Sequence, residues 1–147
     1  MSIEVIRLGG ELGGALELAW RVFLKFEAPD YSEQGVESFR ATLRDKGFLS
    51  QLTAVFGAFE GDRLVGMIAL RKHSTHIALF FVDESFQGRG VGRMLFERAL
   101  SECPANEMTV NSSPYAAEIY HHFGFADEQP EQELDGIRYT PMRLKRK

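Results

Sequence analysis

Apolar residues recur at helical spacing in two segments near the start of the chain. Between residues 11 and 26 the apolar side chains stand three and four positions apart, which predicts an amphipathic helix. Pro29 interrupts this pattern, and a second amphipathic helix is predicted over residues 33–46. Gly47 follows it at a position where helices often end. Residues 3–8 precede both helices and are predicted to form a short strand.

The rest of the chain carries strand patterns separated by two further helices. Residues 52–59 and 64–71 are rich in apolar residues and flank a tight polar turn, so they predict a β-hairpin. Residues 76–82 are apolar on both faces, which is typical of a buried central strand. The remaining predicted elements are a helix over 91–101, a strand over 107–111, a helix that starts at Pro114 after an N-cap at Ser113 and closes at Gly124, and a strand over 136–143. In this order the elements predict an α/β fold, with helices on the faces of a mixed central sheet.

Length and composition fit a single domain spanning residues 1–147. The chain has no repeat and no low-complexity linker, and its 44% apolar and 26% charged residues are ordinary for a globular protein. Cys103 is the single cysteine and cannot form an internal disulfide, so we expect a reducing, cytoplasmic location. No apolar run is long enough to cross a membrane, and the first residues lack the pattern of a signal peptide.

The charge balance argues against one class of partner. Seventeen basic and 21 acidic residues give a formal charge of −4, whereas nucleic-acid-binding proteins usually carry a basic face. The sequence also lacks a cluster of cysteines and histidines with metal-ligand spacing. We therefore expect a protein that binds neither nucleic acid, membrane nor metal.

The most informative segment joins the central strand to the helix that follows. Its three glycines allow unusual backbone torsions and let a ligand approach closely. The first turn of the helix adds unpaired N–H groups and the positive end of the helix dipole. Two arginines add positive charge, so the segment predicts a pyrophosphate site. It reads Gln87, Gly88, Arg89, Gly90, Val91, Gly92 and Arg93.

Three alternatives to this assignment are weaker. A glycine-rich turn without a ligand is possible, but strand, loop and helix follow in the order that an anion site requires. A P-loop would need Gly-Lys-Ser/Thr at its end, where this chain has Gly92-Arg93-Met94. A dinucleotide fingerprint would need glycine at Arg93 and an acid near Asn111, at the end of the next strand.

Two motifs resemble those of the GNAT superfamily of N-acetyltransferases. Residues 87–92 resemble its Gln/Arg-x-x-Gly-x-Gly/Ala acyl-CoA loop. A downstream motif resembles the family's Asn-x-x-Ala-x-x-x-Tyr-x-x-x-Gly-Phe, and here reads Ser113-x-x-Ala116-x-x-x-Tyr120-x-x-x-Gly124-Phe125. Ser113 replaces the more usual asparagine, so a side-chain contact to the cofactor could come from Ser113 or from Asn111. The order of elements resembles the GNAT fold over nearly the whole chain.

The resemblance implies an acetyl-CoA-dependent N-acetyltransferase in which a primary amine attacks the thioester directly. It also implies that strands 76–82 and 107–111 splay apart and that the pantetheine arm pairs with the backbone of Phe81 and Val82. Other implied acyl-CoA contacts are Gln87, Gly88, Arg89, Gly90, Val91, Gly92, Arg93, Asn111, Ser113 and Tyr120. Members of the family often form homodimers, and the sequence leaves the oligomeric state open. A non-catalytic acyl-CoA-binding sensor or interaction module is the alternative function.

Tyr120 matches the family tyrosine and is the candidate for protonating the departing thiolate. A backbone N–H near Phe81 or Val82 is expected to stabilise the oxyanion. Cys103 is expected to pack in the core and not to act as a nucleophile. The general base stays open between Glu27, Asp83, Glu84, His121, His122 and a water chain to solvent.

The acceptor side is implied to lie near two acidic segments. Residues 27–33 and 127–135 contain several acids and no Lys or Arg, which predicts a cationic amine, including one with more than one positive charge. A solvated acidic surface is the alternative. Glu27, Tyr31 and Glu133 are the candidate acceptor contacts.

Overall fold

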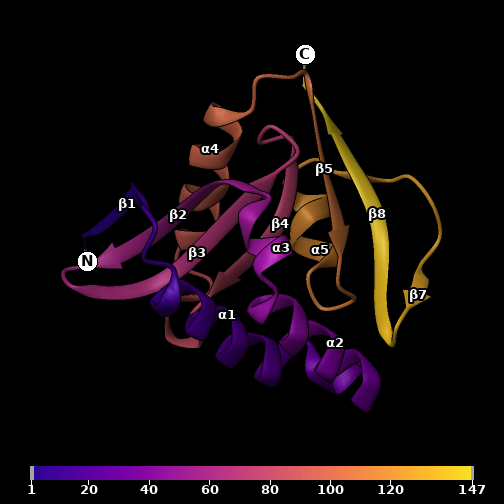
Figure 1. The fold of residues 1–147 in the computed structure, drawn as a ribbon. Coiled ribbons are helices and arrows are strands. Elements are labelled where there is room, and N and C mark those ends of the chain that lie inside the picture. The colour runs from indigo at the N-terminus through magenta and orange to yellow at the C-terminus, as the bar shows by residue number, and fades with distance from the viewer. Residues whose placement is uncertain (1, 147) are drawn as a thin grey trace.

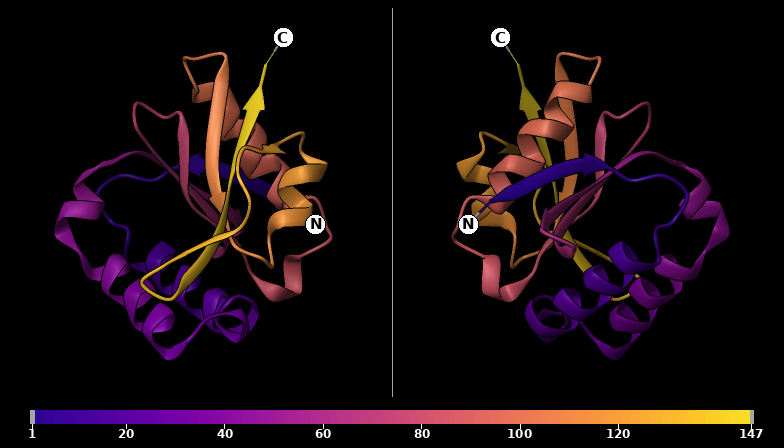
Figure 2. Two further views of the ribbon diagram at one scale, coloured as in Figure 1. Left: turned by 90° about the vertical axis from the view of Figure 1, so that its right-hand side faces the viewer. Right: turned by 90° about the vertical axis from the view of Figure 1, so that its left-hand side faces the viewer.

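The computed structural model describes residues 2–146 and consists of one mixed sheet with helices on both faces (Figures 1 and 2). The strands are β1 (Ile3–Arg7), β2 (Leu52–Glu60), β3 (Arg63–Arg71), β4 (His76–Val82), β5 (Glu107–Ser112), β6 (Ala126–Asp127), β7 (Gln132–Leu134) and β8 (Ile137–Lys145). The α-helices are α1 (Gly13–Phe26), α2 (Glu33–Arg44), α3 (Lys46–Ser50), α4 (Val91–Glu102) and α5 (Ala117–His122), and two short 3-10 helices are η1 (Ala28–Asp30) and η2 (Glu84–Phe86). None of the helices within residues 2–146 is long and apolar enough to cross a membrane.

The strands follow the order β1-β2-β3-β4-β5-β8-β6, with β7 paired to β8. Every pair is antiparallel except β4 and β5, which run parallel because α4 carries the chain back across the sheet between them. The predicted α/β fold with a mixed central sheet is confirmed.

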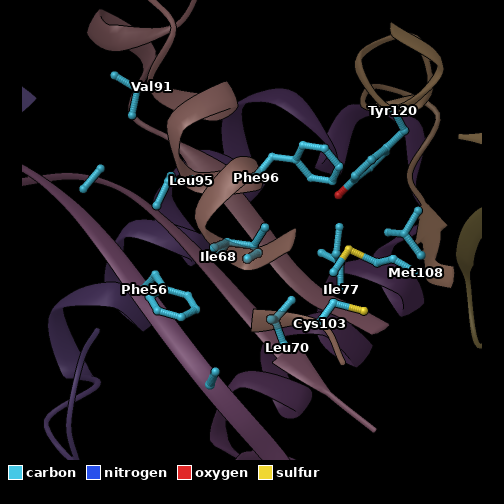
Figure 3. Packing of buried hydrophobic residues seen from close by; sticks show 14 of the residues in the cluster. Phe56, Ile68, Leu70, Ile77, Val91, Leu95, Phe96, Cys103, Met108 and Tyr120 are labelled. Atoms are coloured by element: carbon cyan, nitrogen blue, oxygen red, sulfur yellow. The ribbon is translucent and has the colours of Figure 1, made fainter. Parts of the chain in front are cut away.

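Alternation along the central strands divides the buried side chains between two cores. Phe56 and Ile68 pack on the face covered by α4 and α5 (Figure 3), whereas Val55 and Met67 pack on the face covered by α1 and α2. Side chains of adjacent strand residues point to opposite faces, so one apolar strand can supply both cores. This explains why β2 and β3 read as nearly continuous apolar runs in the sequence.

A bulge interrupts this alternation in β4. Ala69 pairs with Leu79 and Leu70 pairs with Ile77, so Ala78 is an extra residue without a partner on β3. The insertion turns Ile77 toward the α4 core, while Leu79 points toward the α1 core. Such bulges bend a strand and increase its twist, and this one lies where β4 leaves its parallel neighbour.

Strands β4 and β5 are paired over two positions only. His76 pairs with Thr109 and Ile77 with Val110, and residues 78–82 have no partner on β5. The His76 Nδ1 and Thr109 Oγ1 atoms lie 2.7 Å apart and join the side chains at this vertex. The predicted splay of the two central strands is therefore confirmed, and it opens from Ala78 toward the end of β4.

The end of the second helix differs from the sequence expectation. Helix α2 ends at Arg44, and Asp45 caps a further short helix, α3, by accepting the N–H groups of Gly47 and Phe48 at 3.2 and 3.3 Å. Gly47 therefore lies inside α3 and does not end α2. A nearby aspartate can start a new helix, and here that signal outweighs the tendency of glycine to stop one.

The fifth helix also begins later than predicted. Ser113 accepts the N–H of Ala116 at 3.2 Å and so closes a turn over residues 114–116, and α5 begins at Ala117. Its end is as predicted, because Gly124 adopts a φ of +106°. The Phe125 N–H donates to the Tyr120 carbonyl at 3.0 Å, which completes the cap.

Candidate active site

Two clefts meet where β4 and β5 splay apart. The larger, of about 720 Å³, is lined by the glycine-rich segment and by residues from the α4 and α5 side of the sheet. The smaller, of about 220 Å³, is lined by residues of α2, α3, β4 and β8. Five residues line both clefts, namely Glu27, Phe80, Phe81, Ala116 and Tyr120. The two clefts therefore meet at the splay and share part of their lining there.

The glycine-rich segment forms one wall of the larger cleft. Gly88 and Gly90 have φ angles of +75° and +84°, in the left-handed region that favours glycine. A Cβ at either position would meet no atom within 4 Å, so this side of the backbone is open to a ligand. Gly90 immediately precedes α4, whose first turn presents unpaired N–H groups. The arrangement suits a pyrophosphate.

The predicted loop residues divide into two groups. Gln87, Gly88, Gly90, Gly92 and Arg93 line the larger cleft. The other two do not line it, because the Val91 side chain is buried in the α4 core and the Arg89 guanidinium lies 5.4 Å from the Phe86 ring centroid.

The bulge determines which backbone groups of β4 face the splay. The Asp83 N–H donates to Val65 on β3 at 2.8 Å, and alternation directs the Phe81 N–H and C=O to the same side. The corresponding groups of Phe80 and Val82 face β5 and the splay. Phe81 and Val82 were predicted from the sequence to pair with the pantetheine arm through their backbone. Alternation along this strand instead favours the backbone groups of Phe80 and Val82 for that contact. The Phe81 side chain still lines both clefts.

Tyr115 links two sides of the larger cleft. Its hydroxyl donates to Gln87 Oε1 at 3.0 Å, and its ring stacks on Phe26 with centroids 5.0 Å apart. Gln87 in turn donates from Nε2 to the Val82 carbonyl at 3.1 Å. The glutamine therefore occupies an acceptor on the backbone of β4, on the side that a pantetheine arm would use.

Tyr120 lines both clefts, and Figure 3 shows its hydroxyl directed toward Phe96 and Ile77 of the apolar core. The residue is only 5% exposed, and its ring packs against Phe80 and Phe125 at centroid distances of 6.1 and 5.5 Å. Burial, and to a smaller extent the charge of Glu27, raises the pKa of the Tyr120 hydroxyl above its usual value. The hydroxyl therefore stays protonated at neutral pH and can donate.

Glu27 is the carboxylate at the junction. It follows the last residue of α1, and its N–H donates to the Phe23 carbonyl at 2.9 Å. Burial raises the pKa of the Glu27 carboxyl to about 7, although a hydrogen bond from the Ser113 hydroxyl lowers it and the charge of Asp30 raises it further. A carboxyl with this pKa exchanges a proton readily near neutral pH, as a general base must.

The other candidate bases have structural partners. Burial alone would raise the pKa of Asp83, but hydrogen bonds from Arg21 at 2.7 Å and from Ser85 lower it to about 2. Glu84 forms an ion pair with Lys25. His121 lies 2.6 Å from an Asp127 oxygen, on the exposed side of α5. Of the candidates left open by the sequence, Glu27 is the carboxylate that reaches both clefts, and His122 lines the larger one alone.

Two predicted cofactor residues lie in the smaller cleft. Asn111 and Ser113 line the smaller cleft and not the larger one. Tyr31, a predicted acceptor contact, also lines the smaller cleft, where burial and neighbouring carboxylates raise the pKa of its hydroxyl. Most of this lining was not predicted from the sequence, because its members come from four elements that are separated in the chain: Phe39, Thr42, Phe48, Leu79, Ile137 and Tyr139.

The acidic segment at residues 127–135 contributes no residue to the lining of either cleft. Glu133, a predicted acceptor contact, is exposed on β7. Arg143 binds Glu128 at 2.7 Å and Arg138 binds Glu131 at 3.0 Å. Both arginines belong to β8, so two of the acids that appear unopposed in the sequence are paired across the sheet.

Comparisons with a family model and with known proteins agree on one family. The model of the acetyltransferase (GNAT) domain matches residues 27–146. The peptidyl-lysine N-acetyltransferase YjaB of Salmonella typhimurium is 28% identical over 129 residues, which cover 85% of this chain and 84% of that protein. YjaB of Escherichia coli is 33% identical over 90 residues, which cover 59% of this chain and 60% of the relative.

Solved structures share the fold over nearly the full length. A GCN5-related N-acetyltransferase from Rhodopseudomonas palustris superposes with a TM-score of 0.82 at 23% identity, covering 99% of this chain and 96% of the other. PaiA N-acetyltransferase from Thermoplasma acidophilum, in complex with coenzyme A, gives 0.73 at 21% identity, with 99% of each chain covered. The apo form of Escherichia coli YjaB gives 0.72 at 28% identity, covering 99% and 97% of the two chains.

Proposed function

The chain belongs to the GNAT family and is an N-acetyltransferase, and from this premise we propose that it takes the acetyl group from acetyl-CoA at the junction of the two clefts. The observation that carries the proposal is that Glu27 and Tyr120 reach both clefts at one point. A base and an acid are thus placed where the two substrates would meet.

The larger cleft has the features that acetyl-CoA requires. The left-handed glycines and the first turn of α4 offer N–H groups to the pyrophosphate, and Arg93 adds a positive charge. Backbone groups of Phe80 and Val82 face the splay and would pair with the pantetheine amides as a neighbouring strand would. For this pairing Gln87 must release the Val82 carbonyl.

Three groups of the chain each assist one step of the reaction. Glu27 accepts a proton from the incoming ammonium, so that the neutral amine can attack the thioester carbon. The N–H of Phe80 or Val82 donates to the carbonyl oxygen as negative charge develops there. Tyr120 donates its proton toward the sulfur as the carbon–sulfur bond breaks, and it regains a proton from the attacking nitrogen, which thereby becomes the neutral amide nitrogen. No covalent bond to the protein is needed.

The relatives suggest which acceptor to test first. YjaB of Salmonella typhimurium is named a peptidyl-lysine N-acetyltransferase, and the same class of acceptor is our first candidate for this chain. A lysine side chain presents a primary amine on a narrow stem, which suits a cleft of about 220 Å³.

The test separates binding from turnover. Free thiol release is measured with acetyl-CoA and a lysine-containing peptide, and coenzyme A binding is measured by the shift in melting temperature. We expect Tyr120→Phe to keep the coenzyme A shift and to lower kcat by about 10²- to 10⁴-fold, because phenylalanine preserves the packing and removes the donated proton. An unaltered kcat, with chemistry rate-limiting, would exclude Tyr120 from the reaction. Coenzyme A binding without turnover of any amine by the wild type would favour the non-catalytic binding module.

A further inference from the structure

We propose that the smaller cleft, here called the acceptor cleft, takes a primary amine with a single positive charge on an apolar stem and discriminates against polyamines. The inference rests on the proposed function and specifies its substrate class. It departs from the expectation that the acidic segments would recruit a multiply charged acceptor.

The composition of the acceptor cleft is the first argument. Among the described residues 2–146 that line it, Glu27 is the only one with a charged side chain. Its walls are made by aromatic and aliphatic side chains, chiefly Phe39, Phe48, Leu79, Phe81, Ile137 and Tyr139. A methylene or aromatic stem gains by leaving water for such walls, while a second ammonium would lose its hydration without gaining a counter-charge.

The polar groups of the cleft do not supply a negative charge for a second ammonium. Thr42 Oγ1 donates to the Ser38 carbonyl at 3.0 Å, and the Tyr139 hydroxyl donates to Gln132 Oε1 at 3.1 Å. Both hydroxyls are neutral and already engaged. Within the lining, one ammonium can therefore be matched by one carboxylate, that of Glu27.

The acids outside the cleft line neither cleft, and one of them is paired. The Arg138 side chain donates to Glu131 at 3.0 Å and to the Asp30 carbonyl at 3.2 Å, so a guanidinium lies beside both acidic segments. The charges of Glu131, Asp30 and Glu133 all raise the pKa of Arg138, so this region is acidic on balance. The discrimination against a second ammonium therefore depends on the lining of the cleft, where Glu27 is the one charged residue among those described.

Two acceptor sources share the required chemistry. The side chain of a protein lysine and a free arylalkylamine each carry one ammonium on an apolar stem. A panel of Nα-acetyl-lysine amide, a lysine-containing peptide and phenethylamine distinguishes them, because only the first two present a peptide backbone at the mouth of the cleft.

The decisive comparison uses pentylamine and cadaverine, which have the same five-carbon stem and differ by one terminal ammonium. With acetyl-CoA saturating, we expect kcat/KM for pentylamine to exceed that for cadaverine by about tenfold or more, the scale of discrimination that one unpaired polar group in a binding site commonly gives. Raised salt should leave this ratio nearly unchanged, because the discrimination arises inside the cleft and not from long-range attraction.

A charge introduced into the cleft should reverse the preference. Thr42→Glu adds a second carboxylate from α2 and should raise the cadaverine-to-pentylamine ratio of kcat/KM by about tenfold. Thr42→Gln is the matched neutral control and should not. Glu133→Gln removes a charge from the exposed acidic segment and should leave the ratio unaltered. The melting temperature and the coenzyme A shift of each variant show that it is folded.

The possible failures are distinct. A wild-type preference for cadaverine, or equal ratios for Thr42→Glu and Thr42→Gln, would overturn the single-charge proposal and leave acetyl transfer itself supported. A change of the ratio in Glu133→Gln would show that the acidic segment selects the acceptor and would overturn it as well. Absence of turnover with every amine would overturn the proposed function together with this inference.

Discussion

At the scale of single residues, the environment of Glu27 links the pH dependence of the reaction to burial. Because its carboxyl has a pKa raised to about 7, the fraction able to accept a proton grows as pH rises through neutrality. We predict that kcat/KM for the amine rises through about pH 7, in addition to the rise caused by deprotonation of the amine itself near pH ~10.4.

Glu27→Gln should lower kcat/KM by about 10²- to 10⁴-fold and remove the limb of the profile near neutrality, since the amide cannot accept the proton. The measurement is a pH profile of both proteins under conditions where chemistry limits the rate. If kcat/KM still rises near neutral pH in Glu27→Gln, that rise belongs to another group.

The same carboxyl should affect stability in the opposite sense. The folded protein holds a proton on Glu27 between pH 4.5 and about 7, where the unfolded chain does not, so raising the pH through this window destabilises the fold. We predict that Glu27→Gln is more stable than the wild type at pH 8, by on the order of 2 kcal/mol, and that the difference vanishes toward pH ~4.

Denaturant unfolding at the two pH values measures this effect. Glu37→Gln, on the exposed side of α2, controls for the loss of one negative charge. Equal stability of wild type and Glu27→Gln at pH 8 would mean that Glu27 is ionised at little cost in the folded protein.

Both residues of the proposed site were named from the sequence, Tyr120 as the proton donor and Glu27 as one of several candidate bases. Tyr120 was found because a motif fixes its distance from Gly124 within one helix. Glu27 was named both as a candidate base and as an acceptor contact, but its raised pKa arises from burial, against the opposing effect of the hydrogen bond from Ser113. A pattern within one element can be recognised locally, whereas burial by a distant segment becomes evident only after folding.

At the scale of elements, Asp45 connects helix formation with the acceptor cleft. It caps α3, and α3 places Phe48 in the lining of that cleft. We predict that Asp45→Ala lowers stability by about 0.5–2 kcal/mol through loss of the cap and raises KM for the amine. Coenzyme A binding should be unaffected.

Asp45→Asn is the matched control, because asparagine is as good an N-cap as aspartate. Its one side-chain oxygen can accept one of the two N–H groups that the two carboxylate oxygens accept, so it should largely restore both properties. Thermal unfolding and initial rates at varied amine concentration provide the readout. A raised KM for acetyl-CoA in Asp45→Ala would show that α3 acts beyond the acceptor cleft.

The loop before α4 allows backbone strain to be separated from ligand exclusion. Gly90 has a φ of +84° and open space around its missing Cβ. Gly90→Ala should cost roughly 1–2 kcal/mol of stability from left-handed strain. Gly90→Glu should in addition lose the coenzyme A shift, because a carboxylate would face the pyrophosphate.

Gly61 provides the matched control for strain. It lies in the turn between β2 and β3 with a φ of +59° and is equally open. Gly61→Ala and Gly61→Glu should both keep the coenzyme A shift. A full shift in Gly90→Glu would contradict the placement of the pyrophosphate.

Most helices and strands were predictable from the sequence, but the bulge in β4 and the short helix α3 were not. Strands β2, β3 and β4 lie within one residue of their predicted ranges, because their apolar runs are bounded by polar turns. The extra residue Ala78 left no trace in that pattern, since a bulge depends on which residues of the partner strand are opposite. The short helix α3 was missed because Gly47 suggested a stop.

At the scale of the whole molecule, the sequence alone could not show which charged side chains lie next to each other in the fold. The region at residues 127–135 appeared unopposed because its cations, Arg138 and Arg143, follow it in the chain and reach it only through β8. Pairing of strands decides which charges neighbour each other. The overall fold followed from the order of elements, whereas the chemistry of the acceptor side required the strand pairing.

The meeting of the two clefts at the splay also has a kinetic consequence. In the proposed reaction each substrate has a cleft of its own, so both would be bound together, and Cys103 lies outside the linings of both clefts and is not placed to carry the acyl group. We predict a sequential mechanism, with intersecting lines in double-reciprocal plots of initial rate. Radiolabelled coenzyme A should not exchange into acetyl-CoA when the amine is omitted. Parallel lines and rapid exchange would instead reveal an acetylated protein that waits between the two substrates.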